Sequence, residues 1–144
     1  MMEETSEDAV EKVELSEGSE HIVKMLNSGD GGQMIFEPAV IKVSVGDTVH
    51  FKAIDAAHNS VSVDGMVPSG AASWASQLSQ DISVTLDTEG VYVYQCDPHL
   101  IMAMVGVIQV GEAVNIDDIR NSASSYSANF LMNNDRLQSY LNQL

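Results

Sequence analysis

A soft metal site is indicated by nine consecutive residues, Cys96-Asp97-Pro98-His99-Leu100-Ile101-Met102-Ala103-Met104. The string holds a thiol, an imidazole and a thioether within a short stretch of chain. Copper prefers such soft and borderline ligands to carboxylates, with a thiolate and two imidazoles in a trigonal plane and a distant axial thioether. The string therefore predicts a copper site in which Cys96, His99 and one of the two methionines, Met102 or Met104, are ligands and one histidine is still missing.

The missing nitrogen ligand must come from another part of the chain. The other histidines are His21, His50 and His58. His58 follows an alternating run at residues 48–54 and is the best candidate. His50 lies within that run, where a surface or internally bonded histidine is expected, and His21 begins the first predicted strand and is expected to be exposed.

The elements around the string have the order that such a site needs. Residues 91–96 read as a strand that ends at Cys96, and residues 104–110 read as the next strand. The residues between them therefore form a loop at one end of a sheet, where three donors can surround one ion. Pro98 stiffens this loop and lacks an N–H group that would need a partner. A rigid frame around copper favours electron transfer, because the ligands move little between oxidation states.

Short alternating runs separated by turn residues indicate a mainly β fold. Strands are predicted near residues 22–26, 34–36, 40–45, 48–54, 60–63, 82–86, 91–96 and 104–110. About seven or eight short strands of this kind predict an antiparallel sandwich or barrel. Gly46-Asp47 predicts a β-hairpin between the third and fourth runs.

Helices are predicted in two other parts of the chain. Residues 71–78 are rich in alanine and serine and predict a short helix around Trp74. Residues 116–125 and 133–144 lack glycine and proline, and the second stretch has apolar residues at helical spacing. We expect these two C-terminal helices to pack on the sandwich.

Composition limits the possible functions. The chain has 144 residues, which is the size of one domain, and a formal net charge of −15 that disfavours binding to nucleic acid or anionic membranes. A single cysteine excludes an internal disulfide, and no apolar run approaches the ~20 residues of a membrane span. Residues 1–20 are acidic and predict a disordered tail without a secretory signal, so a cytoplasmic chain and an exported domain both remain open.

The motif His58-Asn59 followed by Cys96-x-x-His99-x-x-x-x-Met104 resembles that of the cupredoxins, and the wider chain is most similar to the pseudoazurin family. Similar stretches are residues 25–27, 34–38, 46–49, 65–68 and 104–111. The resemblance covers residues 21–144. It implies a Greek-key β-sandwich over residues 21–111 and two C-terminal helices over about residues 116–144.

The resemblance also implies ligand roles and a function. One type 1 copper would be held by His58, Cys96, His99 and Met104, with Met104 preferred to Met102 as the axial ligand. Asn59 would tie the two ligand loops together, and Met34 would lie close to His99. The implied function is that of a periplasmic, monomeric electron carrier rather than an enzyme. Its implied partners are a copper nitrite reductase or another terminal reductase and a cytochrome-type donor.

The chain departs from the pseudoazurin pattern in charge and in its ligand loop. Pseudoazurins surround the copper end with lysines, whereas this chain has only six lysines and arginines. We therefore expect a partner with a neutral or basic face, or docking through apolar contact; life in high salt is another explanation of the acidity. Leu100, Ile101 and Ala103 replace an aromatic residue and glycines, which predicts a larger apolar patch around His99. Copper storage or delivery with the same ligands is the alternative function.

Overall fold

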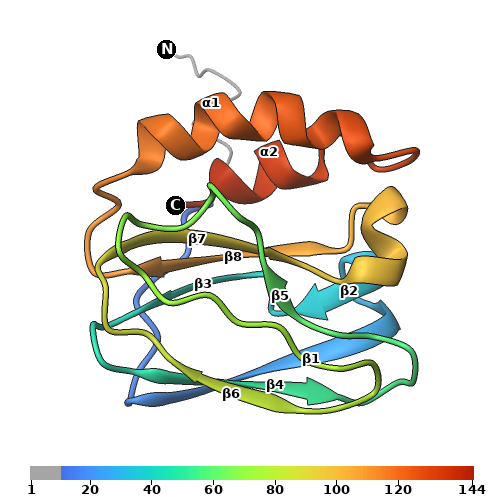
Figure 1. Ribbon diagram of the computed structural model, residues 1–144, viewed down its shortest axis with the longest axis horizontal. Helices are drawn as coiled ribbons and strands as arrows, with labels where there is room; N and C mark the ends of the chain where they lie inside the picture. Colours follow the sequence, from blue (N-terminus) through green and yellow to red (C-terminus); the bar gives the residue numbers. More distant parts are fainter. Residues whose placement is uncertain (1–10) are drawn as a thin grey trace.

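The computed structural model describes residues 11–144 and contains two four-stranded sheets that face each other (Figure 1). The strands are β1 (Glu20–Gly29), β2 (Gly32–Glu37), β3 (Val40–Val43), β4 (Thr48–Ala53), β5 (Val61–Ser62), β6 (Ile82–Thr85), β7 (Gly90–Gln95) and β8 (Val105–Val110). One sheet has the order β2-β1-β4-β6 and the other has the order β3-β8-β7-β5. The mainly β fold with C-terminal helices is confirmed.

Burial along the strands explains why these residues form a sandwich. In β1 the side chains of His21, Val23 and Met25 are buried, while those between them are exposed, which is the period of two of a strand with one covered face. In β7 the residues from Gly90 to Tyr94 are all buried. A strand buried on both faces requires a second layer, and here the C-terminal helices supply it.

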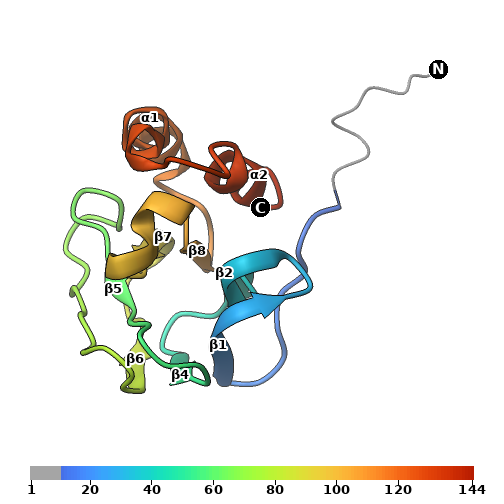
Figure 2. The same ribbon diagram turned by 90° about the vertical axis from the view of Figure 1, so that its right-hand side faces the viewer.

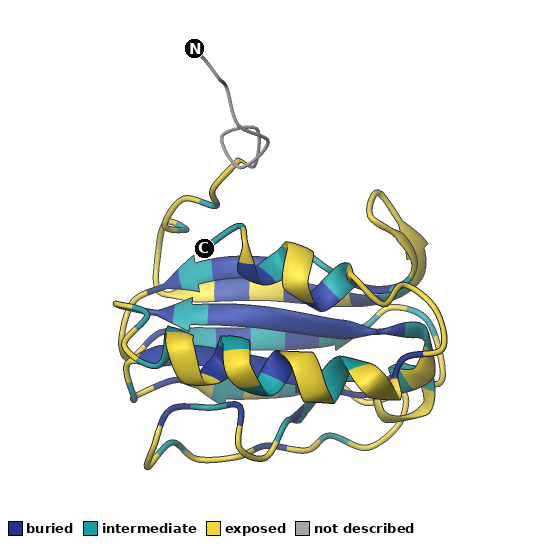
Figure 3. Ribbon diagram, turned by 90° about the horizontal axis from the view of Figure 1, so that it is seen from above, coloured by how far each residue is buried: buried dark blue, intermediate teal, exposed yellow. Residues whose placement is uncertain are grey.

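The helices cover the outer face of the β3-β8-β7-β5 sheet, as Figures 2 and 3 show. They are α1 (Ile116–Tyr126), the short 3-10 helix η3 (Ser127–Asn129) and α2 (Arg136–Leu141). Their inward residues pack against the outward residues of β7 and β8 in a second buried cluster, which includes Val91, Val93, Val105, Val107, Ile119, Ala123, Leu137 and Leu141. The two C-terminal helices are therefore as predicted, although α2 is shorter than the predicted range.

Strand pairing differs from the prediction of an antiparallel sandwich. Strands β1 and β4 pair in parallel, as do β3 and β8. The predicted hairpin between β3 and β4 is wrong, because the turn at Gly46 and Asp47 carries the chain from one sheet to the other. Alternation in a sequence specifies which face of a strand is buried but does not specify its neighbour.

The helix predicted at residues 71–78 is also absent from the structure. The backbone N–H of Trp74 donates to the hydroxyl of Ser62, and Ala75 forms a β-bridge with Val61. The segment is thus held in an extended form by its neighbours. Tertiary contacts have overridden a weak local helix preference.

The acidic N-terminal segment lies only partly within the described residues. Its first ten residues lie outside them. The backbone N–H of Val13 donates to the carbonyl of Gln143 (2.8 Å), and that of Ser16 donates to the carbonyl of Lys42 (2.9 Å). The described part of this segment therefore contacts the domain, and the boundary at residue 21 stays a prediction.

His21 is buried, in contrast to the prediction that it is exposed. Its Nε2 donates to Oδ2 of Asp47 at 2.8 Å, and both residues are less than a tenth exposed. Hydrogen bonds from His21 and from the backbone of Ser44 hold the pKa of Asp47 below its ordinary value. The pair joins the start of β1 to the turn before β4.

Within residues 11–144, no helix has the length and apolar character needed to cross a membrane.

Candidate metal centre

Three predicted ligands converge at one end of the sandwich. Cys96 follows the last residue of β7, His99 lies in the 3-10 helix η2 (Asp97–Met102), and His58 lies in the loop between β4 and β5. The Nδ1 atoms of His58 and His99 are 3.2 Å apart, and Sγ of Cys96 lies 3.7 Å from the first and 3.4 Å from the second. The structure thus brings together one sulfur and two nitrogen donors from segments far apart in the sequence.

The triangle formed by these donor atoms fits a transition-metal ion. The point equidistant from its three corners lies about 2 Å from each donor, which is close to the length of metal–imidazole and metal–thiolate bonds. Two nitrogens and one sulfur in a trigonal plane are the equatorial set of blue-copper sites. The residues present therefore fit copper both in chemistry and in spacing.

Met104 lies next to this triangle. The N–H of Cys96 donates to the carbonyl of Met104 (2.9 Å), and the N–H of Met104 donates to the carbonyl of His99 (3.2 Å). The side chains of Met104 and Cys96 belong to the same buried cluster, and both residues are 0% exposed. Met102, the competing methionine, is partly exposed in η2.

The hydrogen bond of the second ring nitrogen of His58 shows which nitrogen carries the proton. Its Nε2 lies 2.8 Å from Oδ1 of Asn27. A carbonyl oxygen only accepts, so Nε2 carries the proton and Nδ1 presents a lone pair to the donor triangle. Burial, and then the nearby His99, lower the pKa of His58. The neutral form, which is the form that binds metals, is therefore favoured.

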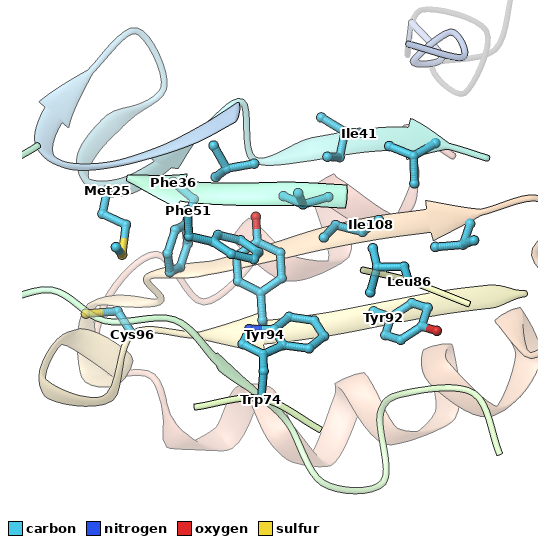
Figure 4. Close-up of a cluster of buried hydrophobic side chains, with 14 of the residues drawn as sticks. Met25, Phe36, Ile41, Phe51, Trp74, Leu86, Tyr92, Tyr94, Cys96 and Ile108 are labelled. Atoms are coloured by element: carbon cyan, nitrogen blue, oxygen red, sulfur yellow. The ribbon is translucent and has the colours of Figure 1, made fainter. Parts of the chain in front are cut away.

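Cys96 is a thiol in a dry environment. Burial raises its pKa, although hydrogen bonds from the backbone partly oppose this effect. Figure 4 shows Cys96 at the end of the aromatic cluster between the sheets, near Met25 and away from the Tyr92 end. A metal ion that binds the thiolate must displace this proton, so metal binding and deprotonation are coupled.

Asn59 ties the two ligand loops together. Its Oδ1 accepts from the N–H of Asp97 at 2.8 Å, and its Nδ2 donates to Oδ2 of Asp97 at 3.2 Å and to the carbonyl of Ser76 at 3.2 Å. These are the hydrogen bonds expected of Asn59. They fix the residue after His58 to the residue after Cys96, and such outer contacts orient metal ligands.

The role of Asn27 was missed by the sequence analysis. Residues 25–27 contributed to the resemblance, but no local pattern connects Asn27 with His58. The two residues are joined by a hydrogen bond between segments 31 positions apart. Only the placement of β1 beside β4 reveals this contact.

Comparisons with known proteins agree with this donor set. Residues 23–111 match the profile of copper binding proteins, plastocyanin/azurin family. The chain is 43% identical to pseudoazurin of Methylorubrum extorquens over 62% of its length and 61% of that protein. It is 40% identical to a putative pseudoazurin of Rhizobium leguminosarum bv. viciae over 71% of its length and 68% of that protein.

A solved structure extends the similarity. Pseudoazurin from Hyphomicrobium denitrificans superposes with a TM-score of 0.78 at 39% identity, and the match covers 87% of this chain and 98% of that one. The match in fold therefore reaches well beyond the profile at residues 23–111. On these similarities the chain belongs to the plastocyanin/azurin family of copper-binding proteins, the cupredoxins.

Proposed function

We propose that this protein is a pseudoazurin-like type 1 copper protein that carries single electrons. The supporting observation is the buried triangle of one thiol sulfur and two imidazole nitrogens. In this proposal His58, Cys96 and His99 are the equatorial ligands and Met104 is the axial ligand. Bound copper would supply the one-electron chemistry, and no residue is required to act as a general acid or base.

The chain's own residues suit an electron carrier in two ways. Hydrogen bonds through Asn27 and Asn59 hold the ligand loops, so the donors keep their positions when the charge on the metal changes. His99 is only half-buried, whereas His58 and Cys96 are fully buried. We therefore assign His99 as the port through which electrons enter and leave.

The visible and EPR spectra of the oxidised, copper-loaded protein test this function. We expect an intense thiolate-to-copper band and a narrow copper hyperfine splitting. Cys96→Ala should abolish the band and leave a folded sandwich, because Cys96 supplies the thiolate. A colourless wild-type protein with an ordinary tetragonal copper signal would refute electron transfer and favour copper storage or delivery. A blue band that survives in the variant would refute the assignment of Cys96 as a ligand.

The axial role of Met104 needs a separate test, because Met102 is only two residues away. Met104→Leu should keep the copper and change its reduction potential, since the thioether tunes the metal. Met102→Leu is the matched control and should leave the potential unchanged. A shift caused by the second substitution and not by the first would reverse the assignment.

We further propose that the partners are redox proteins of the periplasm. The acceptor would be a copper nitrite reductase or another terminal reductase, the donor would be a cytochrome, and the protein would dock as a monomer. Exposed apolar residues lie close to His99, with Ile101, Leu131 and Met132 exposed by 50%, 76% and 48%. The N–H groups of Leu131 and Met132 both donate to the carbonyl of Ile101, so the backbones of these three exposed residues lie side by side, and we name the three residues the apolar patch.

The acidity of the chain narrows the choice of partner. A net charge of −15 opposes docking on an acidic protein, so the partner face should be neutral or basic around an apolar centre. Chemical cross-linking to candidate reductases, with the variant Leu131→Ser as a test of the apolar patch, checks this assignment. Equal cross-linking of wild type and variant would exclude the patch as the docking face.

A further inference from the structure

Arg136 connects three parts of the molecule at the end that holds the donor triangle. It is the first residue of α2, and its Nη1 donates to the carbonyls of Met34 (3.0 Å), Ala103 (3.2 Å) and Met102 (3.3 Å). Its Nη2 donates to the carbonyl of Gln33 at 3.2 Å. Figure 2 shows η2, α2 and the β1–β2 turn at this same end. The guanidinium therefore joins the start of β2 to the end of η2.

Two of the carbonyls that Arg136 binds belong to residues with an unusual backbone conformation. Met34 and Ala103 have positive φ angles of 51° and 60°, a left-handed conformation that residues with a Cβ disfavour. Their oxygens and that of Met102 converge on one nitrogen, so the negative ends of three carbonyl dipoles face each other. The guanidinium of Arg136 stabilises this arrangement, because it is planar, permanently charged and carries five N–H donors in a fixed geometry. A lysine ammonium has the charge but lacks this fixed, forked set of donors.

Arg136 binds the backbone directly before Met104, the proposed axial ligand. Met102 and Ala103 are the two residues that precede Met104 in the chain. Backbone hydrogen bonds join Met104 to Cys96 and to His99, at 2.9 and 3.2 Å. A movement of the Ala103 carbonyl is therefore transmitted to Met104 and to its distance from the other donors.

We propose that Arg136 is a positioning residue that fixes the Met104 end of the ligand loop and thereby tunes the copper site. The inference rests on the proposed function, since it concerns the same copper. Arg136 acts in two ways: its hydrogen bonds set the position of the axial thioether, and its positive charge favours the reduced, less charged metal.

Substitution of Arg136 separates these two effects. Arg136→Gln removes the charge and most of the donors, so we expect a lower reduction potential and an altered EPR symmetry of the oxidised protein. Arg136→Lys keeps the charge but not the fork, so it should restore much of the potential and leave the EPR symmetry altered. If the glutamine variant fails to fold, the lysine variant alone still tests the positional effect through its EPR spectrum.

Arg120 offers a matched control. Its Nη1 donates to Oδ1 of Asn142 (3.1 Å) and its Nη2 to the carbonyl of Leu141 (3.2 Å), so it also holds α2, but at the end away from the ligand loop. Arg120→Gln should lower the stability and leave the potential and the EPR spectrum unchanged. Hydrogen exchange in the metal-free protein adds an independent readout, in which the amides of Cys96 and Met104 should exchange faster in Arg136→Gln only.

Two results would overturn the inference. One is a wild-type potential and EPR spectrum in Arg136→Gln, and the other is an equal shift in Arg120→Gln. Both results leave the wild-type blue site intact, so they differ from failure of the proposed function, in which the wild-type protein itself has no type 1 spectrum.

Discussion

At the scale of single residues, a side chain outside the ligand motif decides which nitrogen His58 offers. Oδ1 of Asn27 accepts a hydrogen bond from Nε2 of His58, and the backbone N–H of Asn27 donates to Oδ2 of Asp55 at 2.8 Å. The segment that carries the amide is thus anchored to the loop that leads to His58. Without this acceptor the ring would lose its preference for the tautomer that turns a lone pair towards the donor triangle.

Replacement of Asn27 should therefore weaken copper binding without loss of the fold. Partners of metal-bound imidazoles typically contribute about 10- to 100-fold in metal affinity. We expect the loss of copper affinity in Asn27→Ala to lie near the lower limit of this range, because Asn27 is exposed and water can replace part of its role. Competition with a copper chelator measures the affinity. Asn129→Ala is the control, since Asn129 is exposed and its side chain, among residues 11–144, bonds only to the carbonyl of Tyr126. Equal affinities of the two variants would contradict the prediction.

At the scale of elements, the loop between β7 and β8 was predictable and the strand pairing was not. Cys96, His99 and Met104 are local in sequence, so their spacing alone indicates one loop between two strands. The parallel pairs β1·β4 and β3·β8 join residues 28 and 67 positions apart in the chain, and alternation carries no information about such partners. For the same reason the sequence did not predict the contact between Asn27 and His58 or the hydrogen bonds from Arg136 to distant backbone carbonyls.

Packing between β7 and β8 depends on a residue without a side chain. Gly106 pairs with Tyr94, and a Cβ at this position would overlap the Tyr94 ring. That ring cannot move freely, because its centroid lies 4.7 Å from that of Phe36 and 5.0 Å from that of Phe51. Gly106→Ala should thus lower the free energy of unfolding by about 1–3 kcal/mol, as overpacked cores do.

Chemical denaturation of the metal-free protein measures this effect. Gly31→Ala is the matched control, since its Cβ would meet only Ile35 at 3.9 Å. The control should change the free energy of unfolding by no more than about 0.5 kcal/mol. Equal stability of the two variants would show that the Tyr94 ring adapts to the added methyl group.

The buried pair His21–Asp47 makes the stability of the sandwich depend on pH. The pKa of Asp47 is lowered in the folded state, first by the hydrogen bond from His21 and then by that from the backbone of Ser44. A lowered carboxyl pKa stabilises the fold above the unfolded value of about 4, and this contribution is lost as the pH falls through the folded value. Asp47→Asn should therefore cost about 1–3 kcal/mol near neutral pH.

The free energy of unfolding of Asp47→Asn should differ less from that of the wild type in acid. We expect the difference in free energy of unfolding to narrow as the pH falls below about 4, because the carboxyl group is protonated first in the unfolded chain and then, below its lowered pKa, in the folded protein as well. Asp64→Asn is the control, since Asp64 is exposed. A difference between wild type and Asp47→Asn that is constant with pH would assign the effect to packing rather than to charge.

At the scale of the whole molecule, charge and apolar surface have separate roles. The end that carries the donor triangle holds the exposed residues Ile101, Leu131 and Met132, and His99 is half-buried there. The net charge of −15 acts over a longer range and does not select a contact. The acidic field should therefore control how often a partner arrives, and the patch should control how it docks.

Small redox complexes of opposite charge test the long-range effect without a protein interface. Oxidation by a trivalent cobalt phenanthroline cation should slow as salt is added, because the Debye length falls from about 30 Å at 0.01 M to about 3 Å at 1 M and screens the attraction. Oxidation by hexacyanoferrate(III), an anion, should accelerate over the same range. The appearance of the blue band after stopped-flow mixing of the reduced protein with each oxidant follows both reactions. If both oxidants showed the same salt dependence, the field at His99 would not follow the net charge, and the preference for a neutral or basic partner would lose its electrostatic basis.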